Sequence, residues 1–461
     1  MNISNIKSVY FIGVGGIGMS AIARYFLSQG KVVAGYDRTP SELTNRLVQE
    51  GAQIHYEEDV NQIPSSCKDK DETLVIYTPA IPSEHQELVW FQNHGFEIQK
   101  RAQVLGTITR SAKALCVAGT HGKTTTSTML AHVMNRATDG CNAFLGGIAK
   151  NYGTNYILSE NSPWVVIEAD EFDRSFHHLS PYITAITSTD PDHLDIYGTK
   201  DAYLESFSHY TSLIQPGGSL VIHEGLEMKP CLQDGVNLYT YGRNTGDFHA
   251  ENIRIGNGEI HFDFISPLEN IKDIELGVPL SINIDNSIAA MAIAQLSGVQ
   301  AEIIKQGISS FSGVDRRFDF HLKGADRAFI CDYAHHPAEI KQSALSIREL
   351  YSEKRVTAIF QPHLYTRTRD FYKEFADSLS LFDEVILTDI YPARELPIPG
   401  VTSQLIADNL KSGVPYTLCN KDEVTNILHQ RNDIEILVLL GAGDLESKAK
   451  EIKEIMNKSE I

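Results

Sequence analysis

The sequence predicts an α/β protein whose three domains are each built on a largely parallel sheet. Short runs rich in Val, Ile and Leu alternate with longer helix-like segments, which is the pattern of strands joined by crossover helices. Two glycine-rich loops each join such an apolar run to a helix-like segment. The length of 461 residues, at about 150 residues per domain, also favours roughly three domains.

The first series of elements precedes residue 109. Apolar runs at 8–14, 31–37 and 73–79 predict strands, and the segment from Met19 to Gln29 predicts a helix between the first two. These elements are the start of a doubly wound domain.

Two further series of apolar runs define the central and C-terminal domains. The central series comprises 113–125, 164–170, 182–189 and 219–223, and the C-terminal series comprises 327–334, 356–363, 384–390 and 435–443. Between them, 253–264 alternates apolar and polar residues around Asn257-Gly258, a preferred pair for a tight hairpin turn, and predicts an antiparallel addition to the central domain. The predicted domains span 1–109, 110–314 and 315–461.

The charge balance excludes two classes of partner. Forty Lys and Arg against 59 Asp and Glu leave a net charge of −19, which repels nucleic acids and anionic membranes. An anionic ligand then needs a locally basic or metal-lined pocket. The sequence leaves the assembly open between a monomer and a homodimer.

Cysteine usage and the apolar segments favour a cytoplasmic protein. The six cysteines are scattered without a CxxC pair, which disfavours a zinc ribbon or a dense disulfide framework and fits a reducing compartment. We expect no signal peptide, because Met1 leads directly into a short apolar strand. The most apolar stretch, 436–440, is far shorter than the roughly 20 residues of a membrane-spanning helix, so we expect no membrane insertion.

A dinucleotide-binding fingerprint follows the first predicted strand. Gly13, Gly15 and Gly18 form G-x-G-x-x-G between a strand and a helix, and Asp37 ends the second strand. The glycines let the backbone approach a pyrophosphate, which the helix N-terminus attracts with its unpaired N–H groups and positive dipole end. The motif predicts a Rossmann-like domain that binds a pyrophosphate. A tight turn without a ligand and a nicotinamide-dependent dehydrogenase are the alternatives.

A second glycine-rich loop, GTHGKTT at 119–125, follows the first strand of the central series. Its backbone N–H groups would cradle phosphates, Lys123 would neutralise the β and γ groups of ATP, and the Thr124 hydroxyl would ligate magnesium. The loop is a shortened variant, because Val117 stands where the general pattern has a glycine. The sequence therefore predicts a central domain of the P-loop ATPase type, with a chance GKT in a structural turn as the alternative.

Acidic residues follow the next two strands of the same series. Doubly wound sheets build their sites at the carboxyl ends of strands, so these residues are candidate ligands for magnesium. Solvated helix caps are the competing interpretation for most of them. The candidates are Glu168, Asp170, Glu171 and Asp173 after one strand, and Asp190, Asp192, His193 and Asp195 after the next.

Histidine and arginine collect after two strands of the C-terminal series. The sequence DYAHHP, with His335 and His336, follows one strand, and QPHLYTR, which ends at Arg367, follows another. Zinc is one explanation for the paired histidines, but adjacent residues on an extended chain point apart, and no HExxH motif or cysteine completes a ligand set. Recognition of a small polar substrate is favoured, with Arg367 able to grip a carboxylate.

The order of the motifs resembles that of the Mur ligases over nearly the whole chain. The motifs are GTHGKTT, EADEFD, DHLDIYG, GVDRRF, DYAHHP, FQPHLYTRT and GAGD, and GVGGIGMS together with DYAHHP and QPHLYTRT resembles the alanine-adding member of the family. The resemblance implies an N-terminal domain that holds a UDP-sugar rather than NAD, a central ATPase, and a C-terminal Rossmann-like domain that completes the ATP site and admits the amino acid.

The resemblance also implies a reaction in the synthesis of peptidoglycan precursors. ATP phosphorylates the lactyl carboxylate of UDP-N-acetylmuramate, and the amine of L-alanine attacks the resulting acyl phosphate to give an amide. ATP and Mg²⁺ are the implied cofactors.

Individual residues receive roles from the same resemblance. It implies that Lys123, His193 and Arg317 are catalytic and that Thr124, Glu168 and His193 bind metal. The implied ATP-binding residues are Gly119, Thr120, His121, Gly122, Lys123, Thr124, Thr125, Asn286, Arg317 and Asp332. The implied UDP-sugar-binding residues are Gly13, Gly15, Gly16, Gly18, Met19 and Ser20. The implied amino-acid-binding residues are Tyr333, His336, His363 and Arg367.

Two positions depart from the family pattern. Ile282 stands where a histidine usually precedes the first asparagine of the adenine-side motif, and Leu364 stands where an arginine is frequent. Several relatives use a carbamylated lysine as a metal bridge, but Lys200 lies too early for that role. The remaining alternatives are a ligase that recycles a whole peptide onto the same UDP-sugar, a folate polyglutamylating enzyme, an NAD-dependent dehydrogenase and a non-catalytic ATP-binding switch.

Overall fold

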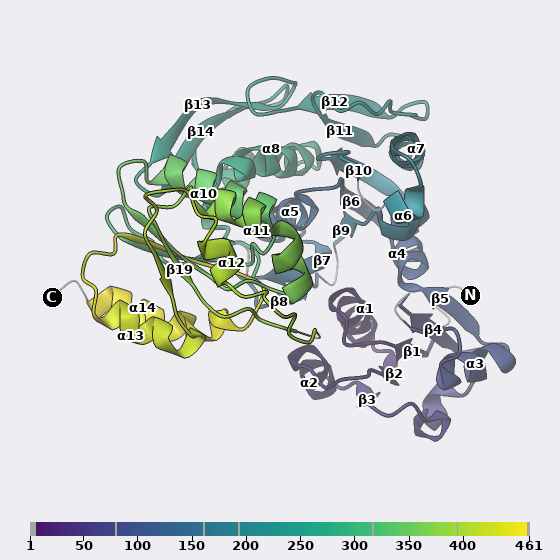
Figure 1. Cartoon of the computed structure of the whole chain (residues 1–461). Coiled ribbons are helices and arrows are strands. Elements are labelled where there is room, and N and C mark those ends of the chain that lie inside the picture. Colours follow the sequence, from purple (N-terminus) through teal and green to yellow (C-terminus); the bar gives the residue numbers. More distant parts are fainter. Residues whose placement is uncertain are drawn as a thin grey trace. The chain divides into compact units, whose positions relative to one another are not determined.

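The computed structural model in Figure 1 describes residues 6–78, 81–159, 162–191, 194–315, 318–393 and 395–458. These residues form four sheets, of five, seven, three and six strands, and confirm the predicted α/β class. The chain divides into two compact units. The first unit comprises Met1–Glu251, Asp263–Lys272 and Asp285–Ser312, and the second comprises Asn252–Phe262, Asp273–Ile284 and Gly313–Ile461. The domain boundaries near 109 and 314 stay predictions.

The N-terminal sheet has the parallel strand order β3-β2-β1-β4-β5, which is typical of a doubly wound domain. The chain order reverses between β1 and β4, so the ligand crevice of such a sheet opens where these two strands end. The three strands predicted from apolar runs are confirmed, and the predicted helix begins at Ile17 rather than at Met19. The elements are β1 (Ser8–Ile12), α1 (Ile17–Ser28), β2 (Val32–Tyr36), α2 (Glu42–Gln49), β3 (Gln53–His55), β4 (Thr73–Tyr77), α3 (Gln86–Asn93), β5 (Glu97–Lys100) and α4 (Arg101–Arg110).

The second sheet has the order β12-β11-β10-β6-β9-β7-β8, with β6 (Lys113–Ala118) at its centre. Strand β6 is buried beyond Lys113, as expected for a parallel strand covered on both faces. The other strands are β7 (Asn142–Ala149), β8 (Thr154–Ile157), β9 (Trp164–Ala169), β10 (Pro181–Ile186), β11 (Ser219–His223) and β12 (Asn237–Tyr241). The helices are α5 (Lys123–Arg136), η4 (Phe172–His178), α6 (Leu194–Tyr197), α7 (Lys200–Thr211), α8 (Ser281–Leu296) and α9 (Ala301–Ser310).

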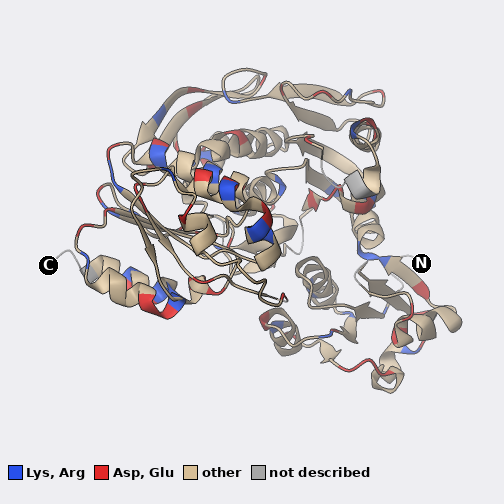
Figure 2. Ribbon diagram, viewed as in Figure 1, with Lys and Arg blue, Asp and Glu red and all other residues tan. Residues whose placement is uncertain are grey.

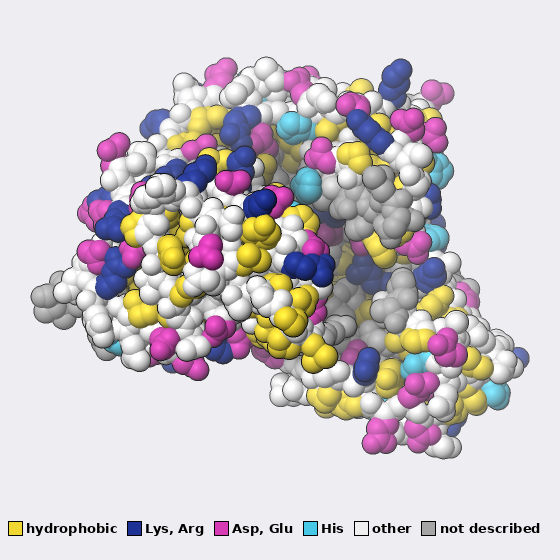
Figure 3. Space-filling model, in the orientation of Figure 1, with side chains coloured by type: hydrophobic (Ala, Val, Ile, Leu, Met, Phe, Trp, Pro, Cys, Tyr) yellow, Lys and Arg dark blue, Asp and Glu magenta, His cyan; other side chains and the backbone are white. Residues whose placement is uncertain are grey.

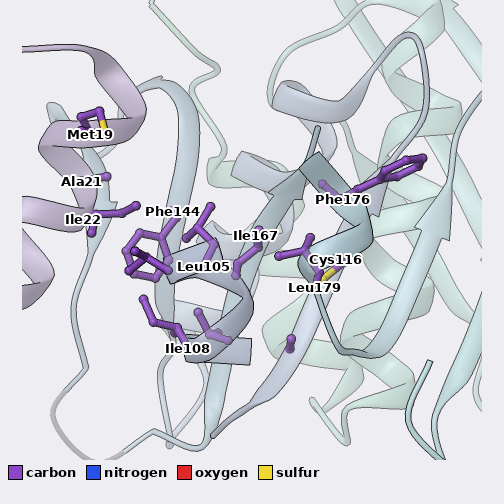
Figure 4. Packing of buried hydrophobic residues seen from close by; sticks show 14 of the residues in the cluster. Met19, Ala21, Ile22, Leu105, Ile108, Cys116, Phe144, Ile167, Phe176 and Leu179 are labelled. Carbon is purple, nitrogen blue, oxygen red and sulfur yellow. The ribbon is translucent and has the colours of Figure 1, made fainter. Parts of the chain in front are cut away.

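One hydrophobic core joins the first two sheets. Figure 4 shows Met19 and Ile22 of α1 in the same cluster as Phe144 of β7 and Ile167 of β9. A buried hydrogen bond crosses the same boundary, because Arg24 Nη1 donates to Asn155 Oδ1 over 3.0 Å. Apolar burial stabilises by about 25 cal/mol per Å², so this shared core holds the two sheets together and explains why both fall within the first unit.

The second unit is built on a six-stranded sheet of order β16-β17-β21-β18-β19-β20. The pair β16 and β17 is antiparallel and the other pairs are parallel, so the loops after β17, β18 and β21 meet at one edge. The strands are β16 (Asp319–Leu322), β17 (Ala328–Asp332), β18 (Val356–Phe360), β19 (Glu384–Leu387), β20 (Tyr416–Leu418) and β21 (Ile436–Leu440). The helices are α10 (Pro337–Leu350), α11 (Tyr365–Leu379), α12 (Gln404–Ala407), α13 (Val424–His429) and α14 (Ala449–Lys458).

The last helix, α14, is amphipathic, as its sequence predicts. Ile452, Ile455 and Met456 are buried in the core of the six-stranded sheet. Figure 2 shows acidic and basic residues together along the same helix. The charged face is thus the solvated face.

The predicted hairpin is confirmed by β13 (His249–Gly256) and β14 (Glu259–Ile265). Asn257 and Gly258 have φ values of 54° and 79°, the positive values that a two-residue hairpin turn of type I′ requires. With β15 (Ile271–Glu275) the hairpin forms a separate sheet. Residues Asn252–Phe262 group with the second unit, whereas the sequence predicted an addition to the central domain.

The surface carries both signs of charge. On the face shown in Figure 3, Lys and Arg side chains lie among Asp and Glu side chains. Among the described residues, no helix combines the length and the apolar composition needed to cross a membrane.

Candidate active site

The loop predicted to bind phosphates lies between β6 and α5. Gly119 and Gly122 have φ values of 136° and 80°, a region that favours glycine. A Cβ atom at Gly119 would lie 2.1 Å from Thr187 Oγ1, and one at Gly122 would lie 2.6 Å from Asn286 Oδ1. The loop therefore needs glycine at both positions, for its conformation and for the space around it.

The carboxyl end of β10 braces this loop. The backbone N–H of Thr120 donates to Ser188 O over 3.2 Å, and that of His121 donates to Ser188 Oγ over 2.8 Å. The Thr120 hydroxyl donates to Asp190 O over 2.7 Å. The first N–H groups of a helix have no acceptor within it, so the start of α5 at Lys123 offers donors to a phosphate.

The Lys123 ammonium is held by a buried carboxylate. Its Nζ lies 2.6 Å and 2.9 Å from the two carboxylate oxygens of Glu171 and donates to Gly119 O over 2.7 Å. The two side chains are 13% and 2% exposed. Burial raises the pKa of Glu171, although the charge of Lys123 acts in the opposite direction. The sequence marked Glu171 only as a candidate metal ligand, whereas the structure pairs it with the lysine of the loop.

Two oxygen-bearing side chains meet beside the loop. The Thr124 hydroxyl donates to Glu168 Oε1 over 3.1 Å, and the N–H of Gly146 donates to Glu168 Oε2 over 3.1 Å. A hydroxyl and a carboxylate are hard oxygen donors of the kind that Mg²⁺ prefers, so this pair fits that ion. The role of Glu168 as a magnesium ligand stays a prediction.

The other predicted acids have different surroundings. Asp170 Oδ1 accepts from the N–H of Phe172 over 3.1 Å, and Asp173 lies 3.5 Å from the Lys100 ammonium at the surface. The Asp190 carboxylate lies 3.7 Å from the exposed His121 ring. The predictions for Asp192, His193, Arg317 and the side chain of Asp195 fall outside the described residues.

Asn286, predicted at the adenine, lies in α8 against the helix that follows the loop. It is 6% exposed, and its Oδ1 accepts a hydrogen bond from the Thr126 hydroxyl over 3.1 Å. The neighbouring Asp285 forms an ion pair with Arg243 over 2.6 Å. Ile282, one of the two departures from the family pattern, is 58% exposed in the first turn of the same helix.

The N-terminal glycine loop is held by the strand beside it. Gly13 has a φ of 88°, and its N–H donates to Tyr36 O over 2.8 Å. The N–H of Gly15 donates to Asp37 Oδ2 over 2.6 Å, so Asp37 braces the loop. Gly16 precedes α1 without a side-chain cap. Met19 and Ser20 are buried behind the loop, and the Ser20 hydroxyl donates to Ile17 O over 2.9 Å.

Arg101, which the sequence did not single out, lies against the third glycine of the motif. A Cβ atom at Gly18 would lie only 1.6 Å from Arg101 Nη1, so the guanidinium occupies the space of a side chain there. Arg101 begins α4 directly after β5. The β5 segment Glu97–Lys100 contains Ile98 as its one apolar residue, so no apolar run marked this strand end.

Two cavities of the first unit adjoin this arginine. One of about 230 Å³ is lined by Gly18, Arg101, Phe144, Glu168 and Asp170 among others. The second, of about 460 Å³, is lined by Gly18, Arg101 and Asp170 and also by residues of the glycine loop. The two cavities share these three lining residues, so they lie next to each other, one at the N-terminal glycine loop and the other at Glu168.

In the second unit, the loops after β17 and β18 bring most of the predicted amino-acid-binding residues together. Arg367 Nη1 lies 3.4 Å from His363 Nδ1, and the His363 ring stacks on Tyr391 with centroids 5.6 Å apart. The ring of His335 lies 6.1 Å from that of His363 and 5.2 Å from that of Tyr333. Burial, together with the charge of Arg367, lowers the pKa of His363.

His336 lies apart from this cluster, with its ring 5.2 Å from that of Phe371. Its N–H donates to Glu339 Oε2 over 3.0 Å as part of the cap of α10. Leu364, the second departure, has a φ of 73° and precedes α11. Backbone strain of this kind gathers at functional sites.

Three further hydrogen bonds lie at the edge of the six-stranded sheet where β17, β18 and β21 end. Gln361 Nε2 donates to Asp444 Oδ1 over 3.0 Å, which joins the loop after β18 to the GAGD motif after β21. Asp332 accepts hydrogen bonds from the Ser343 hydroxyl and from the N–H of Phe318, and burial raises its pKa. Asp332 is therefore fixed within the second unit by its own neighbours.

Three family models match consecutive parts of the chain. They are described as Mur ligase family, catalytic domain, at residues 8–113; Mur ligase middle domain, at 117–294; and Mur ligase, glutamate ligase domain, at 316–446. The chain is also 65% identical over 458 residues to the UDP-N-acetylmuramate–L-alanine ligase of Phocaeicola vulgatus, covering 99% of this chain and 100% of the relative. The chain belongs to the Mur ligase family.

Further relatives agree with this Mur ligase assignment. The UDP-N-acetylmuramate–L-alanine ligase of Parabacteroides distasonis is 57% identical over 460 residues, with 99% of each chain covered. The crystal structure of the UDP-N-acetylmuramate-alanine ligase of Thermotoga maritima matches with a TM-score of 0.77 at 28% identity, covering 98% of this chain and 100% of that chain. A murein peptide ligase from Psychrobacter arcticus matches with a TM-score of 0.62 at 20% identity over 99% of each chain, and shares the fold. The resemblance seen in the sequence and the three-domain Mur ligase architecture are confirmed.

Proposed function

We propose that this Mur ligase joins L-alanine to the lactyl carboxylate of UDP-N-acetylmuramate at the expense of ATP, as a step in peptidoglycan precursor synthesis. The observation that carries the proposal is the pair of cavities that share Gly18, Arg101 and Asp170 and reach Glu168 beside the phosphate loop. The choice of amino acid is supported by the relatives that are 65% and 57% identical. The protein would act in the cytoplasm, where ATP is available.

The chemistry requires activation of a carboxylate. In this proposal the lactyl carboxylate attacks the γ-phosphorus of ATP, ADP leaves, and an acyl phosphate forms. The neutral amine of L-alanine then attacks the acyl carbon, inorganic phosphate leaves, and the amine loses a proton as the amide forms. Phosphoryl transfer between anions depends mainly on charge neutralisation and in-line positioning.

Residues of the phosphate loop supply that positioning in the proposal. The N–H groups at the start of α5 bind phosphate oxygens, and Lys123 moves its ammonium from Glu171 toward the β and γ groups. Thr124 and Glu168 are the described residues that would hold Mg²⁺, which would offset the phosphate charge when bound. The family resemblance assigns His193 to the metal and Arg317 to the γ-phosphate, and both residues lie outside the part of the chain that the structure describes.

The amino-acid site in this proposal is the cluster of the second unit. Arg367 would grip the carboxylate of L-alanine bidentately, because its planar guanidinium matches that group. The lowered pKa of His363 keeps this ring neutral near pH 7, so it can position the substrate without repelling Arg367. Tyr333 and His336 complete the proposed site, Asn286 would contact the adenine, and Asp332 would lie near the nucleotide.

A coupled assay tests the proposed function. We expect phosphate release that depends on both UDP-N-acetylmuramate and L-alanine, with the amide identified by mass spectrometry. Equal or better turnover with a muropeptide in place of L-alanine would favour the recycling ligase. Hydride transfer from a nicotinamide without ATP would overturn the proposal in favour of a dehydrogenase, and nucleotide binding without an amide product would favour an ATP-binding switch.

A further inference from the structure

We propose that Arg101 grips the pyrophosphate of the UDP-sugar, an inference that rests on the proposed function. The residue begins α4 at the carboxyl end of β5, which is the edge where a doubly wound sheet binds its ligand. Its guanidinium lies against Gly18 in the first turn of α1, directly beside the glycine loop.

Arg101 differs from Lys100 and Arg24 in having no hydrogen-bonding or ion-pair partner within the part of the chain that the structure describes. Among the described residues, no hydrogen bond or ion pair joins its guanidinium to another group, whereas Lys100 pairs with Asp173 and Arg24 pairs with Glu50. Arg101 is nevertheless partly buried. A guanidinium carries five N–H donors, and removing them from water without acceptors costs free energy. An anionic ligand in the adjoining cavities would satisfy them.

The charge of the molecule favours such a cation in the pocket. With a net charge of −19, the protein repels a dianionic pyrophosphate unless a positive group lies in the pocket. Arg101 and Lys100 are the Lys and Arg residues among the described lining of the larger cavity, and Asp173 already faces Lys100. Within the described lining of this cavity, Arg101 is thus the cation without an ion-pair partner.

The position of the guanidinium favours the pyrophosphate over the lactyl carboxylate. The first turn of α1 contains no acidic residue, and Gly16 provides no side-chain cap, so its N–H groups are open to an anion. The Arg101 guanidinium stands beside the same turn, at Gly18. Both sets of donors therefore converge on one anion. A side chain at Gly18 would displace the Arg101 guanidinium from this position.

Isothermal titration with two sugars separates the possible anions. UDP-N-acetylmuramate carries a pyrophosphate and a lactyl carboxylate, whereas UDP-N-acetylglucosamine carries only the pyrophosphate. For Arg101→Met in the full-length protein we expect both affinities to fall by a similar factor, roughly 10- to 100-fold for a charge-assisted pair. Arg101→Lys should lie between this variant and wild type, because it keeps the charge but loses the bidentate geometry.

The matched control is Arg110→Met, at the other end of α4, where the guanidinium is exposed and donates to Thr107 Oγ1 over 2.8 Å. This control should bind both sugars as wild type does. Unchanged affinity of a nonhydrolysable ATP analogue, together with an unchanged KM for ATP and a raised KM for UDP-N-acetylmuramate, would show that Arg101→Met is folded and acts at the sugar site.

Three outcomes would contradict the inference or its basis. Wild-type affinity of Arg101→Met for both sugars overturns it. Loss of affinity for UDP-N-acetylmuramate alone assigns Arg101 to the lactyl carboxylate and overturns the pyrophosphate assignment. If wild type itself binds neither sugar, the proposed function fails instead.

Discussion

The buried ion pair of the phosphate loop makes a quantitative prediction about stability. Lys123→Met leaves the Glu171 carboxylate, whose side chain is 2% exposed, without its counter-ion. Breaking a buried pair in this way costs about 3 to 5 kcal/mol. Because Lys123 is itself 13% exposed, some water reaches the pair, and we expect a loss near the lower end of that range.

The carboxyl group can reduce this cost by taking up a proton, which makes the loss depend on pH. Burial already raises the pKa of Glu171 above its ordinary value of 4.5, and removal of Lys123 raises it further. The folded variant then holds a proton that the unfolded chain has released, so its stability relative to wild type falls as the pH rises. The slope reaches at most about 1.4 kcal/mol per pH unit.

Urea unfolding followed by tryptophan fluorescence at about pH 6 and about pH 8 measures this effect. Both tryptophans, Trp90 and Trp164, lie in the first unit with Lys123, so the signal reports the correct part of the chain. The double variant Lys123→Met/Glu171→Gln is the control. It should recover most of the stability and lose the added pH dependence. A single variant as stable as the double variant at about pH 8 would refute the reasoning.

Three further predictions concern other parts of the structure. Gly122→Ala should weaken Mg-ATP binding at least about tenfold in calorimetry, because its Cβ would lie 2.6 Å from Asn286 Oδ1. The control is Gly225→Ala, which has a similar φ but open space around the Cβ and should bind Mg-ATP normally. Burial raises the pKa of Glu87 from 4.5 to about 7, so the free energy of unfolding of wild type should fall as the pH rises through this range. A Glu87→Gln variant whose free energy of unfolding falls with pH at the same slope would contradict this prediction. Arg367→Ala should raise the KM for L-alanine far more than that for ATP in steady-state assays, and equal changes would remove Arg367 from the amino-acid site.

The sequence predicted the elements that local pattern determines. Apolar runs located β1, β6 and β18, and Asn257-Gly258 located the hairpin, because burial and turn conformation follow from neighbouring residues. The meeting of Thr124 with Glu168 was also predictable, since the carboxyl ends of parallel strands share one edge.

The sequence pattern could not predict contacts between residues that are far apart in the chain. Nothing local to Glu171 indicates that its carboxylate faces a lysine 48 positions earlier in the chain rather than a metal ion. The position of Arg101 could not be predicted either. Its proposed role depends on β5, a strand with little apolar character, and on Gly18 in another element. Of two adjacent histidines, the sequence could not specify that His335 faces His363 while His336 faces Phe371.

The continuous core beneath the first two sheets has a consequence for ligand design. Phe144 belongs to that core and also lines the smaller cavity, so the wall of the cavity is part of the packed interior. A rigid wall loses little conformational entropy when a molecule enters, and preorganised sites of this kind bind more tightly for the same contact area. An inhibitor that fills both cavities would therefore act on a receptor already shaped to accept it, and resistance by substitution at Phe144 would also weaken the fold.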